Sequence, residues 1–158
     1  MKHLRPIGQF INKICSSIPE DLIILSSRVA IASVFWRSVQ TKISGWEVYD
    51  QSLQFYNVSA SAVMLFQYEY NLPLLSPNVA AHAASFAEFF FPIMLVLGLG
   101  TRFAALGLLS VTAVIQFLVF PEAWPTHILW FALLLYIAKH GGGRIALDRF
   151  FRTSVLKN

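Results

Sequence analysis

The sequence is poor in charge and in cysteine, and both shortages narrow the class of protein. Only 13% of its 158 residues are charged, whereas 56% are apolar, and soluble domains carry roughly a quarter of charged residues. So few charges cannot cover the surface of a small soluble domain, and the apolar residues therefore need lipid around them. The single cysteine, Cys15, excludes an internal disulfide and a pair of thiolate ligands. The composition predicts a membrane protein whose partner is the lipid bilayer.

The sequence motifs of several enzyme classes are also missing. The chain has no GxGxxG after a strand, no Walker loop, no HExxH, no CxxC and no GxSxG. Its basic residues are not interleaved with aromatic ones on a polar face, so nucleic acid is not expected as a partner. His82 and Glu88 are six positions apart and fall on different faces of one helix. We therefore predict no metal site and no covalently bound cofactor.

Four apolar segments predict an all-α fold. They lie at about 22–43, 79–99, 103–120 and 124–138. At 1.5 Å per residue the first spans about 33 Å, which is enough to cross a hydrocarbon core of about 30 Å. The last segment is shorter and needs flanking residues or local thinning of the bilayer. We predict an integral membrane four-helix bundle that forms a single domain over 1–158.

Three further segments predict helices that lie on the membrane surface. In residues 1–18 apolar side chains recur at helical spacing between basic ones, and Pro19 is expected to end that helix. The loop at 44–78 is rich in aromatic residues and favours two short helices over the mouth of the bundle. After three glycines at 141–143, apolar residues alternate with arginines up to Leu156. Each segment is typical of an amphipathic interfacial helix.

The distribution of Lys and Arg predicts the orientation. The N-terminus, the turn at 101–102 and the C-terminus carry most of these residues. The opposite side holds Glu47, Asp50, Glu69 and Glu122, with Lys42 at its border. Because basic loops stay in the cytoplasm, both termini are expected there.

Polar residues inside the spans are the candidate functional residues. Each buried charge costs roughly 2.5–3.5 kcal/mol on insertion scales, so such residues pair with one another or line a polar cavity. Arg28 and Arg37 lie in the first span, Glu88 in the second and Gln116 in the third. Either they form interhelical ion pairs, with one arginine reaching Glu88, or they line a site for an anionic or quinone-like ligand. His127 is a candidate donor to a ligand or a proton relay.

Short motifs then follow one another in a fixed order through residues 22–150. They are Arg28, FWRS at 35–38, Lys42, YNLP at 70–73, Glu88, Pro92, LVLGLGTR at 95–102, Gln116, PEAW at 121–124, His127 and GGGRIALD at 141–148. Their order and spacing resemble the DoxX family of small bacterial membrane proteins. The resemblance implies a bacterial inner-membrane protein with four transmembrane helices. It also implies an association with redox and sulfur metabolism, since relatives include a subunit of thiosulfate:quinone oxidoreductase.

Three functional hypotheses remain open at this point. The first is a redox-associated subunit, such as the membrane subunit of a quinone-linked oxidoreductase, that holds a quinone-like or other small ligand in the bundle. Its ligand-binding residues are then Arg28, Trp36, Arg37, Glu88, Gln116, His127 and Trp130, and a protein partner supplies the electrons. The second is a non-enzymatic membrane anchor or assembly factor. The third is a small metal or anion transporter that works as a homo-oligomer.

Overall fold

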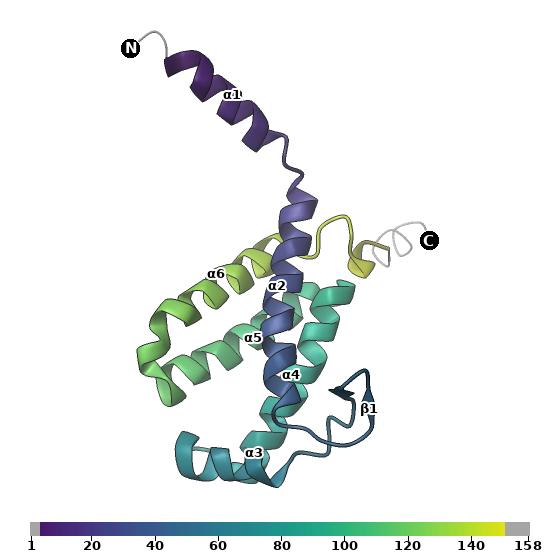
Figure 1. Cartoon of the computed structure of the whole chain (residues 1–158), viewed down its shortest axis with the longest axis vertical. Coiled ribbons are helices and arrows are strands. Elements are labelled where there is room, and N and C mark those ends of the chain that lie inside the picture. Colours follow the sequence, from purple (N-terminus) through teal and green to yellow (C-terminus); the bar gives the residue numbers. More distant parts are fainter. Residues whose placement is uncertain (1–3, 151–158) are drawn as a thin grey trace.

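A computed structural model describes residues 4–150 of the chain, with side chains from residue 9 onward, and its backbone is mostly helical (Figure 1). The elements in chain order are α1 (Leu4–Ser16), α2 (Glu20–Gln40), β1 (Glu47–Val48), β2 (Gln51–Ser52), α3 (Ala60–Leu65), the π-helix η1 (Phe66–Tyr70), α4 (Pro77–Leu97), α5 (Thr101–Val114), the π-helix η2 (Ile115–Val119), the 3₁₀ turn η3 (Pro121–Ala123) and α6 (Trp124–His140). The two π-helices directly continue α3 and α5.

Three helical stretches in the described part of the chain are long and apolar enough to cross a membrane. They are Glu20–Gln40, Pro77–Leu97 and Thr101–Val119, the last of which joins α5 to η2. The helix α6 has 17 residues and so spans about 26 Å, somewhat less than a hydrocarbon core of about 30 Å. The structure therefore describes a mostly helical membrane protein with three clear candidate spans.

The ends of α2 and α4 follow from local chemistry. Pro19 precedes α2, and Glu20 and Asp21 place negative charge in its first turn, where the helix dipole favours it. The helix α4 ends at Gly98, whose φ of 72° is left-handed. The Gly98 and Leu99 amides donate to the carbonyls of Leu95 and Met94, which is a Schellman turn. Glycine adopts this conformation without the steric cost of a Cβ atom.

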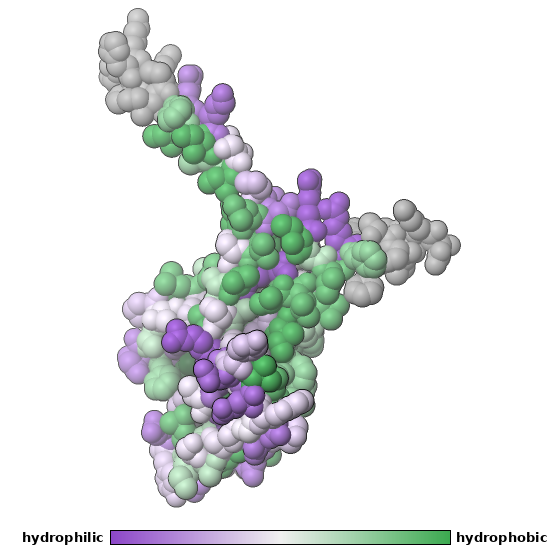
Figure 2. All heavy atoms as spheres, turned by 45° about the vertical axis from the view of Figure 1, so that its right-hand side comes forward, coloured by the Kyte–Doolittle hydropathy of each residue, from purple (hydrophilic) through white to green (hydrophobic). Residues whose placement is uncertain are grey.

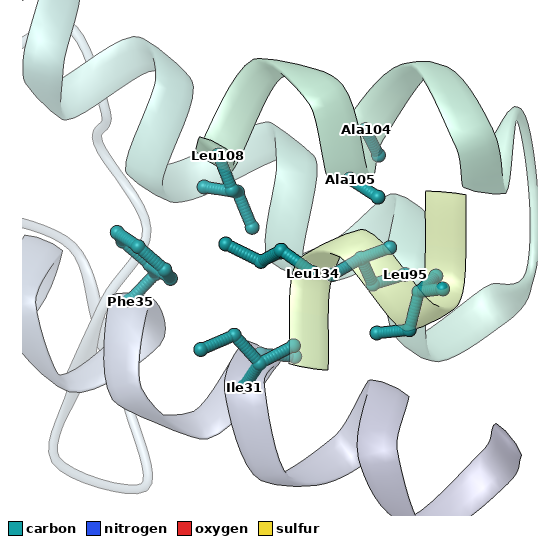
Figure 3. Close-up of a cluster of buried hydrophobic side chains, with 9 residues drawn as sticks. Ile31, Phe35, Leu95, Ala104, Ala105, Leu108 and Leu134 are labelled. Atoms are coloured by element: carbon teal, nitrogen blue, oxygen red, sulfur yellow. The ribbon is translucent and has the colours of Figure 1, made fainter. Parts of the chain in front are cut away.

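The four longer helices pack around a common core. The helix α2 contacts α4 and α6, and α5 contacts α4 and α6. Side chains from all four helices meet between them, and Figure 3 shows Ile31, Phe35, Leu95, Leu108 and Leu134 pointing toward one another. The small residues Ala104 and Ala105 are fully buried and let α5 approach its neighbours closely.

The outer faces of these helices are apolar as well. Large apolar side chains such as Val29, Phe86, Phe103 and Leu129 are exposed. Figure 2 shows hydrophobic residues over the upper part of the helical body, with hydrophilic residues beside the C-terminal segment and over the lower part of the face shown. A water-soluble protein does not leave so much apolar surface uncovered, so these faces are suited to contact with lipid.

The segment between α2 and α4 differs from the two helices expected in it. Its first half is a short hairpin, in which Glu47 pairs with Ser52 and Val48 with Gln51. Tyr49 and Asp50 form the two-residue turn, with φ values of 50° and 58°. Positive φ at both positions is the conformation that closes a tight hairpin and is incompatible with a helix. Only the second half, α3 with η1, is helical.

The two ends of the described chain lie at the same end of the molecule. Figure 1 shows α1 projecting from the top of α2, close to the end at which the C-terminal segment finishes, whereas the hairpin and α3 lie at the opposite end. The predicted N-terminal helix corresponds to α1, which stops before Pro19. Residues 151–158, which hold much of the predicted C-terminal amphipathic segment, lie outside the described residues.

Candidate ligand site

A cavity of about 360 Å³ lies between the helices. Residues of α2, η1, α4, α5, η2 and α6 line it, and most of them are apolar. We call it the interhelical cavity. Its polar lining consists of Ser38, Lys42, Tyr70, Glu88, Ser110 and His127. A largely apolar cavity with a few polar groups is the usual form of a small-molecule site.

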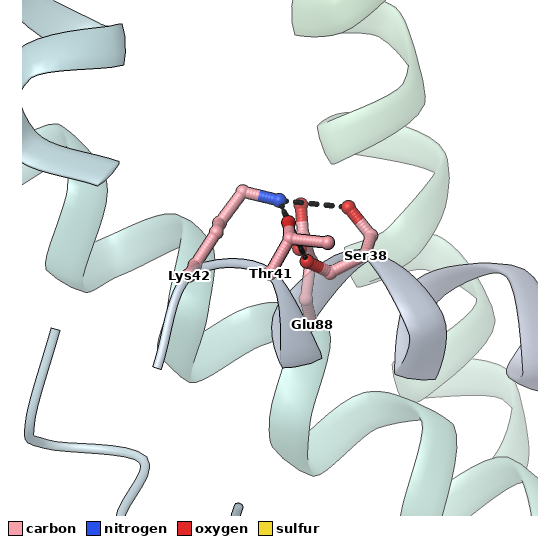
Figure 4. A network of polar contacts seen from close by, with 4 residues as sticks. All are labelled: Ser38, Thr41, Lys42 and Glu88. Atoms are coloured by element: carbon pink, nitrogen blue, oxygen red, sulfur yellow. Dashed lines mark hydrogen bonds and ion pairs between the residues drawn. The ribbon is translucent and has the colours of Figure 1, made fainter. Parts of the chain in front are cut away.

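One wall of the interhelical cavity carries a buried ion pair. The Lys42 Nζ atom lies 2.8 Å from Oε2 of Glu88, and the two side chains are 7% and 2% exposed. The same ammonium donates to the hydroxyl and to the carbonyl oxygen of Ser38, at 2.7 and 3.2 Å. Figure 4 shows these contacts, with Thr41 beside them. An ammonium has three N–H donors, so Lys42 is saturated by its own protein partners.

The Glu88 carboxylate is less completely used. Its Oε2 atom accepts from Lys42, whereas its Oε1 atom has no hydrogen bond from any residue the structure describes. Glu88 is also a lining residue of the interhelical cavity. A carboxylate only accepts hydrogen bonds, so Glu88 offers the cavity an acceptor.

Another wall carries His127, near the start of α6. Its Nδ1 atom lies 2.8 Å from Oε1 of Gln116, and the Gln116 Nε2 atom donates to the Pro121 carbonyl at 2.8 Å. The second bond fixes which end of the amide faces the imidazole, because only Nε2 can donate to a carbonyl. Oε1 is therefore an acceptor, and Nδ1 of His127 must carry the proton. The imidazole also packs on Trp130, with ring centroids 4.8 Å apart.

Both π-helices contribute to the same cavity. In η1 the Asn71 amide donates to the Phe66 carbonyl, and in η2 the Phe120 amide donates to the Ile115 carbonyl. Each bond spans five residues and widens the helix by one residue per turn. The first π-turn ends at Tyr70, which lines the cavity, and the second contains Gln116, which orients His127. Such π-turns occur frequently at functional sites.

Tyr70 lines the cavity from η1, outside the long helices, and carries a hydroxyl. Burial raises the pKa of this phenol above its ordinary value, and the negative charges of Glu88 and Glu69 raise it further. Tyr70 is therefore protonated at neutral pH. Its ring packs against Phe66 and Phe120 with centroids 4.9 and 5.6 Å apart.

The structure brings together some of the seven predicted ligand-binding residues and separates others. Glu88, His127 and Trp130 line the interhelical cavity, and Gln116 lies directly behind His127. Trp36 lies outside it, where its ring packs on Phe89 and its indole donates to Gln51. Arg37 is exposed and outside the lining. Glu88 pairs with Lys42 and with neither arginine.

Arg28 serves the main chain rather than the cavity. Its guanidinium is fully buried and donates four hydrogen bonds. The acceptors are the carbonyls of Leu95 and Val96 at the end of α4, and those of Gly142 and Ile145 in the C-terminal segment. Arg28 thus gives the Val96 carbonyl a partner, adds a second donor to the Leu95 carbonyl, which already accepts from the Gly98 amide, and ties the C-terminal segment to α2 and α4.

Asp148 completes this connection from the C-terminal segment. Its carboxylate accepts from the amides of Gly100 and Thr101 and from the Thr101 hydroxyl, at 2.6, 2.9 and 2.8 Å. It therefore caps the first turn of α5. Burial alone would raise the pKa of Asp148, but these hydrogen bonds and the charge of Arg28 outweigh it and lower that pKa below its ordinary value.

Sequence reasoning did not assign Lys42, Ser38 or Tyr70 to the site. The charge distribution puts Lys42 at the border of the side opposite the termini, although its spacing of four from Ser38 indicates that the two share a helix face. Tyr70 had no such signal, because a π-turn leaves no periodic pattern. Among the described residues, no group of three or more His, Cys, Asp or Glu side chains is arranged to hold a metal ion.

Comparison with protein families shows to which family the chain belongs. The family model described as DoxX matches residues 23–121. This range includes α2 from residue 23 onward and the whole of α4, α5 and η2, together with Lys42, Tyr70, Glu88 and Gln116 from the site. No curated protein and no solved structure matches the chain.

Proposed function

Since the chain belongs to the DoxX family, we propose that it is an integral membrane protein that holds a small, largely apolar ligand of quinone type between its helices and acts with a partner protein. The observation that carries this proposal is the interhelical cavity, whose apolar walls carry the Lys42–Glu88 pair and His127. Its volume of about 360 Å³ falls within the range of about 300–1,000 Å³ typical of ligand sites.

The cavity has chemistry suited to a planar ring. Phe35 and Trp130 line it with aromatic faces and edges, and their ring centroids are 5.7 Å apart. The polar groups are few and lie on separate walls, which fits a ligand with a flat apolar body and polar atoms at its edge. The protein contributes binding and orientation, and the electrons in any redox reaction come from the partner.

Extraction of the purified protein tests this proposal. The chain is purified in mild detergent, extracted with organic solvent and analysed by mass spectrometry for quinones. Ala84→Phe fills the cavity, because Ala84 lines it, and Ala113→Phe adds the same ring to an exposed position of α5. A quinone retained by the wild type and by Ala113→Phe but lost from Ala84→Phe supports the proposal. Equal or absent quinone in all three preparations contradicts it.

We further propose four spans with both termini in the cytoplasm, in a bacterial inner membrane. The basic residues Lys13, Arg102, Arg144 and Arg149 lie in α1, in the first turn of α5 and in the segment after α6, and this distribution supports a positive-inside topology with those segments in the cytoplasm. Cys15 is exposed and is the chain's single cysteine. A membrane-impermeant maleimide is expected to label it only after cells are opened. Trp46→Cys with Cys15→Ser should be labelled in intact cells.

A second candidate function is supported by the hairpin. Trp46 and Tyr49 are 72% and 95% exposed, and exposed aromatic residues are enriched at protein interfaces. A membrane anchor or assembly factor that docks a partner there needs no ligand. The two functions can be compared in cells that lack the native protein. If Ala84→Phe restores the wild-type phenotype there but Trp46→Ser with Tyr49→Ser does not, the anchor function is favoured over the ligand-binding one.

A further inference from the structure

Among the side chains that line the interhelical cavity, fixed acceptors that are free to bind a ligand outnumber fixed donors that are free to do so. The three N–H groups of Lys42 are already used, because they are bound to Ser38 and Glu88. The Ser110 hydroxyl donates to the Leu106 carbonyl within its own helix. The hydroxyls of Ser38 and Tyr70 can rotate, so each can donate or accept. Trp130 also lines the cavity, and its indole N–H is a fixed donor that has no hydrogen bond within the described residues. Lys42 and Ser110 therefore offer a ligand no free donor, and Trp130 offers one.

Two atoms on different walls of the cavity, by contrast, are free and can act only as hydrogen-bond acceptors. On α6, His127 carries its proton on Nδ1 because that atom faces the Gln116 Oε1 acceptor. A buried imidazole in lipid is neutral, because the charged form loses its hydration there. Its Nε2 atom then has a free lone pair, and within the described residues it has no hydrogen-bond partner. On α4, Oε1 of Glu88 is the second such acceptor.

We infer that the ligand presents O–H donors to this cavity, so that the site binds the reduced, hydroquinone form of a quinone-type molecule in preference to the oxidised form. A quinone has carbonyl oxygens, which accept only, and these meet acceptors at His127 and Glu88. Its hydroquinone has two hydroxyls, and one of them can donate to Nε2 of His127. A buried acceptor left without a donor is costly, so the difference favours the hydroquinone. This inference rests on the proposed function and specifies the redox state that the site holds.

The preference is measurable with a matched pair of probes. Tetramethyl-1,4-hydroquinone and tetramethyl-1,4-benzoquinone have the same ring and methyl groups and differ only in their oxygens. We expect anaerobic calorimetry on the full chain in detergent to give about tenfold or tighter binding for the hydroquinone, the effect of about one buried hydrogen bond. The dimethyl ether of the hydroquinone lacks the O–H donors, and we expect it to bind no better than the quinone. The comparison of these three compounds uses only the wild-type protein.

Variants locate the preference on one atom. His127→Phe keeps an aromatic ring against Trp130 but removes the Nε2 acceptor. We expect the ratio of the two affinities to fall to about one in this variant, mainly through weaker hydroquinone binding. His82→Phe makes the same change at an exposed position of α4 that does not line the cavity, and we expect the wild-type ratio there.

Failure of the inference and failure of the proposed function give different results. If the quinone binds as tightly as the hydroquinone, or more tightly, the inference is overturned while a quinone-type ligand remains. The same holds if His127→Phe keeps the wild-type ratio. If neither probe binds and no quinone is extracted from the wild type, the proposed function itself is overturned, and with it the inference.

Discussion

The Lys42 ammonium and the Glu88 carboxylate meet at 2.8 Å between the end of α2 and the middle of α4. Each is nearly inaccessible, so each depends on the other for its charge to be stable in an apolar environment. Ser38 also fixes the position of the ammonium, because its hydroxyl and its carbonyl oxygen both accept hydrogen bonds from it. It therefore joins two helices and sets the polarity of one wall of the cavity.

Removal of one partner from this ion pair should be far more harmful than removal of both. Lys42→Met leaves the Glu88 charge buried and unpaired, and we expect a loss of about 3 kcal/mol in the free energy of unfolding. Lys42→Met combined with Glu88→Leu should recover most of that loss, because an apolar pair needs no charge partner. The thermal unfolding midpoint in detergent is the measurement. Lys139→Met controls for loss of an exposed lysine. Equal losses in the single and the double variant would contradict this interpretation.

Arg28 and Arg37 lie on the same helix but should respond very differently to the same substitution. The Arg28 guanidinium makes four hydrogen bonds with main-chain carbonyls in two segments. A lysine ammonium has only three donors, in a different geometry. We expect Arg28→Lys to lower the free energy of unfolding by about 2 kcal/mol.

The second arginine provides the matched control for that change. Arg37 is exposed, so Arg37→Lys should change stability by no more than about 0.5 kcal/mol. Thermal unfolding midpoints of both variants and of the wild type decide the matter. Similar midpoints for the two variants would show that the Arg28 contacts contribute little.

The contribution of Asp148 should depend on pH. Its pKa in the folded protein is below the ordinary value of about 3.9 because of the Thr101 and Gly100 hydrogen bonds and the charge of Arg28. A lowered pKa adds stability at pH values above the ordinary pKa, and that stability is lost as the pH falls through the folded pKa. The wild type should therefore exceed Asp148→Asn in unfolding midpoint near pH 7, and the difference should shrink below about pH 4.

A neutralised carboxylate elsewhere controls for the general effect of charge. Asp50→Asn removes a carboxylate from the exposed turn of the hairpin, away from Arg28 and α5. Its effect on the midpoint is expected to be small at neutral pH. If Asp148→Asn gives a midpoint difference that stays constant between pH 7 and pH 3, the ionised form of Asp148 contributes nothing to stability.

Long apolar runs made the helical elements predictable. The expected spans at 22–43, 79–99, 103–120 and 124–138 overlap α2, α4, the joined α5 and η2, and α6. Composition and length determine such segments because a helix satisfies its main-chain hydrogen bonds within one apolar segment in lipid. The hairpin at Tyr49 and Asp50 was not predictable in the same way. Its left-handed turn depends on local contacts and not on hydrophobic periodicity.

The sequence allows the polar residues inside the spans to be identified, but it does not allow their interaction partners to be predicted. The free-energy cost of a charge in lipid identifies Arg28 and Glu88 as unusual residues. The two do not pair with each other, because helix packing brings Lys42 to Glu88 and main-chain carbonyls to Arg28. Only the relative rotation of α2 and α4 decides this, and a single sequence does not encode that rotation in any simple pattern. Gln116 and His127 were both identified, but their hydrogen bond depends on the π-turn in η2.

The Gln116–His127 hydrogen bond should fix the position of one proton. In the wild type the Gln116 acceptor holds the proton on Nδ1 of His127. Nitrogen-15 NMR of histidine-labelled protein should therefore show an unprotonated Nε2, in a signal that disappears in His127→Phe. Gln116→Leu removes the acceptor, so both tautomers should be populated and the hydroquinone preference should fall. Gln67→Leu, at an exposed position of η1, should change neither. A protonated Nε2 in the wild type would show that Gln116 does not position this imidazole.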